Sequence, residues 1–511
     1  MINLTKLPEP ELIFGYEQPL EDPRDGLTLF GPLRENSPFG IHYGLVGTEA
    51  GISRFYRWTK KILGPSAHSK VSKRTLWVPF PGFEEAFGIK FSTKASSEMV
   101  IDSVILKKIL REDDPYKRVY QTVNLYVKAI LDFYKRADEG INLWYVVSPE
   151  SVFRECRPRS TIDDPIKHVS TDTINKRKRM AQLSKEGQGF IFPQQEQDYY
   201  AYYFDNDFRR QLKARLIMER VKDPIQILRE STLTPNDFLD KWGNPERDLE
   251  PDSQLAWNLF STTFYKAGGK PWKLNNIREG VCYLGMVFKK LEDSHNERFA
   301  CCAAQMFLDS GDGVVFQGAV GPWKSAKRED YHLNEEAAKE IIDRAVEAYK
   351  CIFDKNTNPK EIFIHGKTFL NDEEWAGFSS ITNTGIKVVG VRIRQSSLRL
   401  YSPGKFPVLR GMALIETKKK GYLWSTGFIP RLRTFPHPGI PYPLEIEICK
   451  GEADILTVLK DILALTKLNY NACKFADGKP ITLQFADKIG DILTAGPIEK
   501  DEAPLPFKFY I

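Results

Sequence analysis

The strongest constraint on the fold is an alternation of apolar strands and amphipathic helices in the first third of the chain. Residues 141–147 form a mainly apolar run, with Asn142 as its one polar residue, that stops at Ser148, as expected of a buried strand. The segment before it opens with Asp114 and a proline, a helix N-cap and N1 pair, and repeats apolar residues at spacings of three and four. Residues 41–47 predict an earlier strand, after which Thr48 can cap another helix. This alternation predicts a doubly wound α/β layer around a mostly parallel sheet.

The second half of the chain has a different pattern. Apolar strands are predicted at residues 280–288, 298–308 and 314–317, before a long helix at 335–352 and a returning strand at 361–366. An antiparallel meander followed by a helix and a returning strand is typical of an RNase H-like domain. We therefore predict an α/β protein with two domains of different topology. Close to the N-terminus, residues 26–33 predict a short lead-in strand closed by a Gly-Pro turn.

Composition narrows the class of protein. A chain of 511 residues, 42% of them hydrophobic, can bury more than one core. The seven cysteines are scattered without a Cys-x-x-Cys pair, which predicts free thiols and a cytoplasmic location. No stretch approaches about 18 uncharged apolar residues and the N-terminus lacks a signal-peptide pattern, so no membrane association is expected. The net charge of +6 permits nucleic-acid binding without requiring it.

A helix that stops abruptly contains the first candidate binding residue. Residues 258–266 predict a helix that begins with asparagine and ends at Lys266. Gly268 and Gly269 predict its left-handed exit, and Pro271 prevents continuation. A lysine held at a helix end beside two glycines lies where a backbone or a phosphate can approach closely.

A second group of polar residues precedes that helix. Residues 207–215 predict a basic helix in which Arg209 and Lys213 are four apart and share a face, and Gln226 lies in a short strand at 225–228. A phosphate monoester has three acceptor oxygens and needs several fixed cations and amide donors, which Arg209, Lys213, Gln226 and Lys266 could supply. Taken singly, each of these residues is more simply interpreted as a solvated surface side chain.

Together these motifs resemble the junction between the MID and PIWI domains of Argonaute proteins. The resemblance implies a Rossmann-like MID domain at residues 1–270, with lead-in strands at its start, and an RNase H-like PIWI domain at residues 271–511. It also implies that the 5′ phosphate of a nucleic-acid guide binds at Arg209, Lys213, Gln226 and Lys266. Arg209 departs from the family, which usually has tyrosine or histidine there; the charge is kept, while stacking on the first base is not implied.

The resemblance extends to residues outside this group. Arg392 and Arg394 lie at the end of a strand predicted at residues 388–394, where they would contact a nucleic-acid backbone. In some prokaryotic Argonautes the terminal carboxylate joins the guide phosphate through a metal ion. The resemblance therefore implies a Mg²⁺ ion between the guide phosphate and Ile511.

The positions of the PIWI metal-binding acids are altered in this sequence. The family strand that reads apolar-Gly-apolar-Asp ends here in Val287, and the family's Arg-Asp-Gly reads Ile-His-Gly around His365. Only Asp487 keeps an acid at its position, and the family's loop glutamate has no clear match, with Glu329, Glu335 and Glu336 as candidates. A two-metal nuclease needs three or four ligands, and valine cannot bind a metal. We therefore expect no catalytic residues and no cleavage by this chain.

A MID and PIWI pair without N-terminal or PAZ domains resembles a short prokaryotic Argonaute. Such proteins usually pair with an APAZ-domain effector, most often a TIR-type NADase and less often a sirtuin-like NADase or a nuclease. The resemblance implies that a guide RNA pairs with single-stranded target DNA and switches the partner, with formation of a higher oligomer, in defence against plasmids or phage. Base pairing then supplies the sequence specificity, so the protein needs only backbone contacts.

Two other functions remain open from the sequence. One is a metal-dependent guided nuclease that uses displaced acids such as Asp309, Asp312 or Asp487. The other is a scaffold whose partner alone holds the nucleic acid. The sequence does not distinguish an RNA guide from a DNA guide, because that choice depends on contacts to the 2′-hydroxyl. It also leaves open the 5′ base preference, the effector type and the oligomer formed on activation.

Overall fold

The computed structural model describes most of the chain. The described residues are 3–35, 37–67, 76–136, 140–158, 160, 170–188, 193–275, 278–290, 299–307, 313–317, 320–321, 332–352, 357–401, 403–434, 439–496 and 505–511.

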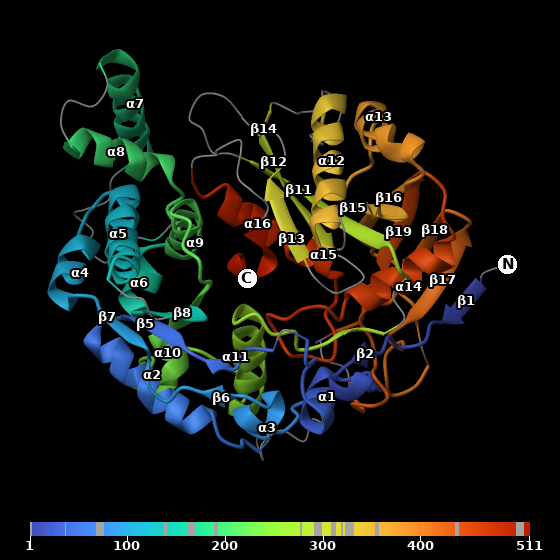
Figure 1. Ribbon diagram of the computed structural model, residues 1–511, viewed down its shortest axis with the longest axis horizontal. Coiled ribbons are helices and arrows are strands. Elements are labelled where there is room, and N and C mark those ends of the chain that lie inside the picture. Colours follow the sequence, from blue (N-terminus) through green and yellow to red (C-terminus); the bar gives the residue numbers. More distant parts are fainter. Residues whose placement is uncertain are drawn as a thin grey trace.

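A four-stranded parallel sheet organises the N-terminal half (Figure 1). Its strand order is β7 (Ser97–Val100), β5 (Tyr43–Gly47), β8 (Leu143–Ser148) and β9 (Ile225–Arg229). Consecutive strand residues point to opposite faces, so each face needs its own helical layer. The predicted doubly wound arrangement is therefore present, with the strand at residues 141–147 in the middle of the sheet.

Helices cover both faces of this sheet. On one face Tyr145 packs against Phe55 of α2 (Glu49–Ile62), with ring centroids 5.0 Å apart. On the other face Trp144 packs against Phe133 of α5 (Pro115–Tyr134), and α9 (Phe208–Met218) lies in the same core. The predicted caps are in place, since the side chain of Thr48 accepts a hydrogen bond from the α2 backbone and that of Asp114 accepts from the α5 backbone.

The C-terminal half is built on a larger mixed sheet. Its central strands β11 (Val281–Lys290), β15 (Glu361–Gly366) and β16 (Lys387–Gln395) are parallel, and antiparallel neighbours extend it on both sides. The strands added on one side are β19 (Leu444–Lys450), β18 (Lys420–Leu423), β17 (Met412–Thr417) and β1 (Asn3–Lys6). On the other side lie β12 (Phe299–Phe307), β13 (Gly313–Gln317), β14 (Val320–Gly321) and β20 (Leu505–Pro506).

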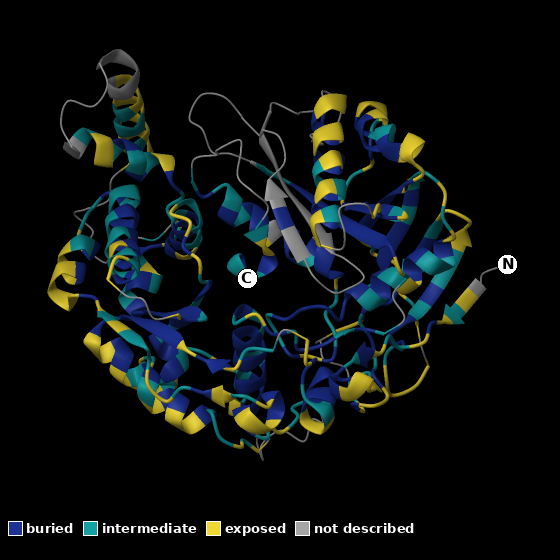
Figure 2. Ribbon diagram, in the orientation of Figure 1, coloured by how far each residue is buried: buried dark blue, intermediate teal, exposed yellow. Residues whose placement is uncertain are grey.

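Two groups of helices enclose this sheet. One face packs against α12 (Glu335–Ile352) and α13 (Asp372–Ser379), and the other against α14 (Ile455–Leu465), α15 (Ile481–Gln484) and α16 (Ala486–Leu493). The antiparallel meander, the long helix at 335–352 and the returning strand at 361–366 are all present, as predicted for an RNase H-like domain. Figure 2 shows the central strands β15 and β16 as largely buried and α12 and α13 with exposed outer faces.

The N-terminal segment contradicts one prediction. Residues 26–33 were expected to form a strand, but α1 (Pro23–Phe30) is a helix that covers most of them. Asp22 explains the difference, because its side chain accepts a hydrogen bond from the backbone of Arg24 and Pro23 occupies the N1 position. The apolar run alone did not reveal this start signal.

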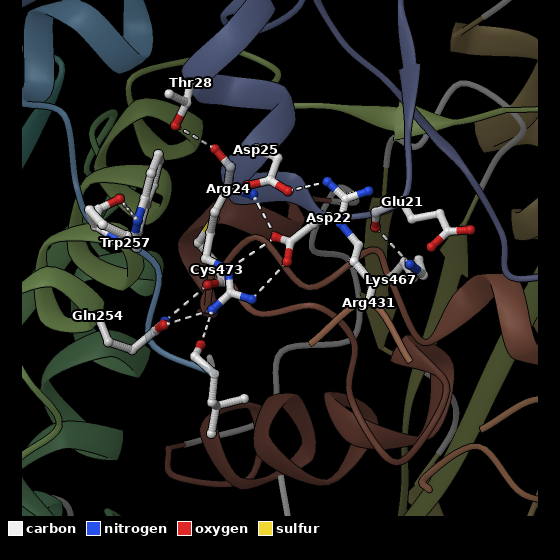
Figure 3. Close-up of polar contacts among 12 residues, drawn as sticks. Glu21, Asp22, Arg24, Asp25, Thr28, Gln254, Trp257, Arg431, Lys467 and Cys473 are labelled. Atoms are coloured by element: carbon white, nitrogen blue, oxygen red, sulfur yellow. Dashed lines mark hydrogen bonds and ion pairs between the residues drawn. The ribbon is translucent and has the colours of Figure 1, made fainter. Parts of the chain in front are cut away.

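The same N-terminal segment joins the two halves. Strand β1 pairs with β17, and β2 (Leu12–Ile13) pairs with β3 (Pro19–Leu20) and β10 (Lys273–Leu274). From α1, the buried guanidinium of Arg24 pairs with Asp22 and donates to Gln254 Oε1 at 3.2 Å, and Gln254 Nε2 donates to the carbonyl of Cys473 at 2.9 Å (Figure 3). This network fixes α11 (Asp252–Lys266) against the C-terminal half.

Smaller elements complete the chain. Helices α7 (Thr171–Gln188) and α8 (Pro193–Tyr203) stand at one corner of the molecule (Figure 1). The remaining short elements are β4 (Gly40–Ile41), α3 (Phe83–Phe87), β6 (Lys90–Phe91), α4 (Ser103–Leu110), α6 (Glu150–Glu155) and α10 (Glu230–Leu233). Within the described ranges, no helix is both long enough and apolar enough to span a bilayer.

Candidate nucleic-acid interface

Helix α9 brings two of the predicted phosphate-binding residues to the boundary between the halves. Asp207 caps this helix by accepting from the backbone amides of Arg209 and Arg210 at 3.0 Å each. Arg209 is exposed in the first turn, and Lys213 follows one turn later on the same face. The ammonium of Lys213 donates to the backbone oxygen of Ile511 at 2.7 Å and to that of Tyr510 at 3.1 Å. The last residues of the sequence therefore lie against a helix almost 300 residues earlier.

Helix α11 brings Lys266 to the same place. Lys266 lies in the last turn and is 1% exposed. Its ammonium donates to the backbone carbonyl of Ile225 at 2.8 Å and to Gln226 Oε1 at 2.7 Å, both on β9. Gln226 is half-buried, so its side-chain NH₂ group is the part that a ligand can still use. The structure thus brings together Arg209, Lys213, Gln226, Lys266 and Ile511, which we call the cationic pocket.

A stripe of polar residues sets the position of α11. Gln254, Asn258, Thr262 and Lys266 are each four residues apart and so lie along one face of the helix. Asn258 Oδ1 accepts from the backbone amide of Cys473 at 3.0 Å, and Thr262 donates to the carbonyl of Tyr470 at 3.1 Å. The first three residues of the stripe hold the helix to the segment around Cys473, and the fourth contacts β9.

The helix ends as its sequence predicts. Gly268 has φ +101°, a conformation that favours glycine, and its amide donates to the carbonyl of Tyr265. The amide of Gly269 donates to the carbonyl of Phe264, whose ring leaves no room for a β-carbon at Gly269. The chain then turns away at Pro271. Lys266 lies in the last turn of the helix, where the surrounding structure buries it.

The pocket places the positive charges of Arg209, Lys213 and Lys266 close together. Burial, and then the charges of Arg209 and Lys488, lower the pKa of Lys213 to about 7. Burial, and then the charges of Lys213 and Arg209, lower the pKa of Lys266 well below its ordinary value. Among the described residues, neither ammonium forms an ion pair with a carboxylate side chain. The arrangement favours a bound anion, which would restore the charged state of both lysines.

Sequence reasoning missed two cations whose charges act on this group. Lys488 lies in α16, and its charge acts on both Lys213 and Arg209. It follows Asp487 directly, but nothing in the local spacing indicates that α16 reaches α9. Arg247 was missed in the same way: its pKa is lowered by burial and then by the charges of Arg229 and, more weakly, Arg209. Only the tertiary packing reveals these neighbours.

Arg392 and Arg394 are placed in β16, where acidic residues engage both. Glu445 Oε1 lies 3.0 Å from Arg392 Nη2 and 2.8 Å from Arg394 Nη2. Arg392 is buried and also pairs with Glu447 at 2.9 Å. Arg394 is about half exposed, so it retains donors for a ligand, whereas Arg392 is committed to the sheet.

Val287 and His365 are the residues that the resemblance aligns with the PIWI metal-binding acids. Val287 in β11 and His365 in β15 are both buried, and Gly285 lies opposite His365 in the parallel register. His365 Nδ1 lies 3.0 Å from Thr482 Oγ1 of α15, and burial lowers the pKa of this imidazole to about 3. The neutral imidazole of His365, which is hydrogen-bonded to Thr482, carries no charge that would attract a divalent cation. The apolar side chain of Val287 carries none either.

The other candidate acids are only partly described. Asp487 lies in α16 with its side chain outside the described part, and Asp309, Asp312 and Glu329 fall outside the described residues altogether. Glu335 and Glu336 are exposed in the first turn of α12. The described side chains contain no group of three or more His, Cys, Asp or Glu residues that could hold a metal ion.

The two sheets and the cationic pocket between them define a mixed α/β fold of the Argonaute kind. The chain superposes on Clostridium butyricum Argonaute bound to a guide DNA and a 19-mer target DNA with a TM-score of 0.57 at 14% identity. It superposes on Aa-Ago with externally bound siRNA with a TM-score of 0.56 at 13% identity, and on A. aeolicus Argonaute with 0.53 at 13%. The predicted fold class is confirmed by these likenesses.

The match covers nearly all of this chain and about half of the others. It includes 97%, 99% and 98% of this chain, but 53%, 56% and 54% of the three Argonaute chains. No protein-family model matches the sequence, and no curated protein is similar to it in sequence. At 13% to 14% identity these likenesses establish the fold alone.

Proposed function

We propose that this chain binds a guide RNA by its 5′ phosphate in the cationic pocket and presents it for pairing with single-stranded target DNA. The observation that carries the proposal is the pairing of the half-buried Lys213 with the buried Lys266: the pKa of each is lowered, and no described carboxylate side chain pairs with either. A phosphate monoester carries nearly two negative charges and three acceptor oxygens, which suits several convergent cations. The Argonaute-like fold supports this reading, since one similar structure holds a guide and a target.

The proposal includes a Mg²⁺ ion at the same place. The backbone oxygens of Tyr510 and Ile511 already face the ammonium of Lys213, and oxygen atoms are the ligands that Mg²⁺ prefers. A Mg²⁺ ion held between Ile511 and the guide phosphate would neutralise part of the phosphate charge. Guide affinity should then fall when the divalent cation is removed with a chelator, and more for a 5′-phosphorylated strand than for a 5′-hydroxyl strand.

We also propose that the chain does not cut its target. Val287 and the neutral His365 occupy positions where a two-metal nuclease needs carboxylates. Target pairing would instead activate an APAZ-domain effector, most simply a TIR-type NADase with a sirtuin-like one as the second choice, through a higher oligomer. This requires the guide–target duplex to bind the assembled state more tightly than the separate proteins.

The decisive test is a charge reversal in the pocket. Lys213→Glu combined with Lys266→Glu removes two charge-assisted contacts worth about 1.5–3 kcal/mol each, so affinity for a 5′-phosphorylated RNA should fall by about a hundredfold or more. The same RNA with a 5′ hydroxyl should lose much less. Lys107→Glu combined with Lys108→Glu, on the exposed face of α4, changes the net charge equally and serves as the matched control.

Two results would overturn the proposal. Unchanged affinity for the phosphorylated strand in the pocket variant would mean that the nucleic acid is held elsewhere, as in a scaffold. Metal-dependent cleavage of a paired target by the wild-type chain would mean that displaced acids form an active site. Guide strands of RNA and DNA, compared at one salt concentration, decide which of the two the pocket prefers.

A further inference from the structure

The cationic pocket lies between two helices from different halves of the chain. Helix α9 carries Arg209 and Lys213, and α16 carries Lys488, whose charge acts on both. An anion that contacts cations on both helices needs α9 and α16 at a fixed separation, because a displacement of about 1 Å weakens hydrogen bonds and positioned contacts considerably. The residues that join these two helices are therefore of interest.

Asp491 joins α9 and α16 directly. It lies three residues after Lys488 on α16, and its Oδ2 atom is 3.0 Å from Arg210 Nη2 of α9. Its Oδ1 atom is 2.9 Å from Lys289 Nζ of strand β11. One carboxylate thus contacts a cation from each half of the chain. The three side chains are 23% to 39% exposed, so water screens these pairs in part and their main effect is geometric.

The turn before α9 is tied to the same end of α16. Arg210 uses its other nitrogen to pair with Asp205 at 3.2 Å. The backbone amide of Asp205 donates to the carbonyl of Ala495 at 2.9 Å, and Gln211 donates to the carbonyl of Asp205 at 2.7 Å. Arg210 therefore lies between two carboxylates, one on its own turn and one on the neighbouring helix. The pair with Asp491 links α9 directly to α16.

We propose that Asp491 is a positioning residue for the guide phosphate, which holds α9 and α16 at the separation that lets Arg209, Lys213 and Lys488 face one anion. This inference rests on the proposed function and adds the residue that makes the pocket selective. Asp491 and Asp205 together also neutralise Arg210 and Lys289 beside the pocket. The net positive charge is thereby concentrated on the side chains that face the 5′ end, and the pocket distinguishes a terminal phosphate from the internal phosphates of any strand.

The test is the ratio of two affinities of the protein: that for an RNA with a 5′ phosphate and that for the same RNA with a 5′ hydroxyl. Asp491→Asn keeps the shape of the side chain and removes its charge, which breaks its ion pairs with Arg210 and Lys289. Affinity for a 5′-phosphorylated RNA should fall by about tenfold. Affinity for the same RNA with a 5′ hydroxyl should stay constant or rise, because the variant has one more positive charge near the strand. If Asp491 acted only through its negative charge, Asp491→Asn would raise the affinities for the 5′-phosphorylated and the 5′-hydroxyl RNA together.

Further variants separate positioning from folding. Asp491→Glu retains the carboxylate and should recover most of the ratio, and Arg210→Gln should reproduce the effect of Asp491→Asn. Glu340→Gln breaks an exposed ion pair with Arg344 on α12 and should leave the ratio unchanged. The melting temperature of each variant, measured without RNA, reports any general loss of stability.

The outcomes decide both proposals separately. If wild type prefers the 5′-phosphorylated strand and Asp491→Asn keeps that preference, the role of Asp491 is refuted while the pocket stands. A parallel fall of both affinities together with the melting temperature also refutes it. If wild type shows no preference at all, the pocket itself is refuted, and the role of Asp491 with it.

Discussion

The ammonium groups of Lys213 and Lys266 determine what the pocket can bind. Both are surrounded by backbone oxygens and by other cations, and burial lowers the pKa of each. A cation in such a place destabilises the unliganded fold, since desolvation is only partly offset by hydrogen bonds to carbonyls. The negative charge of a bound phosphate would offset this desolvation, so the charged ammonium groups would stabilise the complex.

Replacing Lys213 by methionine should stabilise the unliganded protein and abolish its selectivity for a 5′ phosphate. An unfolded lysine holds its proton up to about pH 10.5, whereas folded Lys213 loses it near pH 7. Unfolding therefore takes up a proton between these values, and the free energy of unfolding contributed by Lys213 rises with pH across that window. The advantage of Lys213→Met should be largest at about pH 7 and vanish near pH 10.

Melting temperatures measured from pH 7 to pH 10 check this prediction. Lys107→Met in the exposed face of α4 is the control and should show no pH-dependent difference from wild type. A variant at Lys213 that is less stable than wild type at pH 7 would show that its ammonium is satisfied within the protein.

At the scale of the elements, close approach between secondary structures decides where glycine is required. A β-carbon at Gly285 in β11 would lie 2.3 Å from the backbone oxygen of Thr482 in α15. In the sequence, Gly285 belongs to the motif that ends in Val287, where the family has a metal-binding acid. The structure adds that this glycine lets α15 pack directly onto the sheet, where Thr482 contacts His365.

Gly285→Ala should destabilise the protein by about 1–3 kcal/mol or more, because the backbone of α15 has to move to accept a methyl group. Gly366→Ala in the neighbouring strand β15 is the matched control. A β-carbon there meets nothing closer than 3.6 Å, and its effect should stay within about 0.5 kcal/mol. Denaturant unfolding of the two variants measures both values, and equal destabilisation would mean that α15 is not tightly packed.

At the scale of the whole molecule, the pocket is formed only when distant segments meet. Its residues come from α9, β9, α11, α16 and the last turn of the sequence, so an anion bound there joins the two halves. The N-terminal segment reinforces the same junction through Arg24, Gln254 and Cys473 (Figure 3). The chain spans about half the length of the Argonautes it resembles.

A 5′-phosphorylated RNA should therefore stabilise the whole protein. At a concentration 100 times its dissociation constant, the expected gain in unfolding free energy is about 2.7 kcal/mol. The melting temperature should rise more with the phosphorylated strand than with its 5′-hydroxyl form at the same concentration. The Lys213→Glu, Lys266→Glu variant should show no rise with either strand. Equal stabilisation by both strands in the wild type would place the binding surface outside the pocket.

The sequence by itself determined the elements and the fold class. Periodicity, the caps at Thr48 and Asp114 and the glycines after Lys266 are local signals, and local signals act through bonds and spacings of a few residues. The error at residues 26–33 arose where an apolar run was weighed without the cap at Asp22.

The tertiary structure alone decided which side chains share the pocket. Lys213 meets Ile511 across 298 residues of sequence, and Lys488, Arg210 and Asp491 meet only because α9 packs beside α16. The predicted residues were found through a family resemblance, and those without a motif were not. Contacts between distant segments depend on how whole sheets and helices pack, and no short spacing in the chain records that geometry.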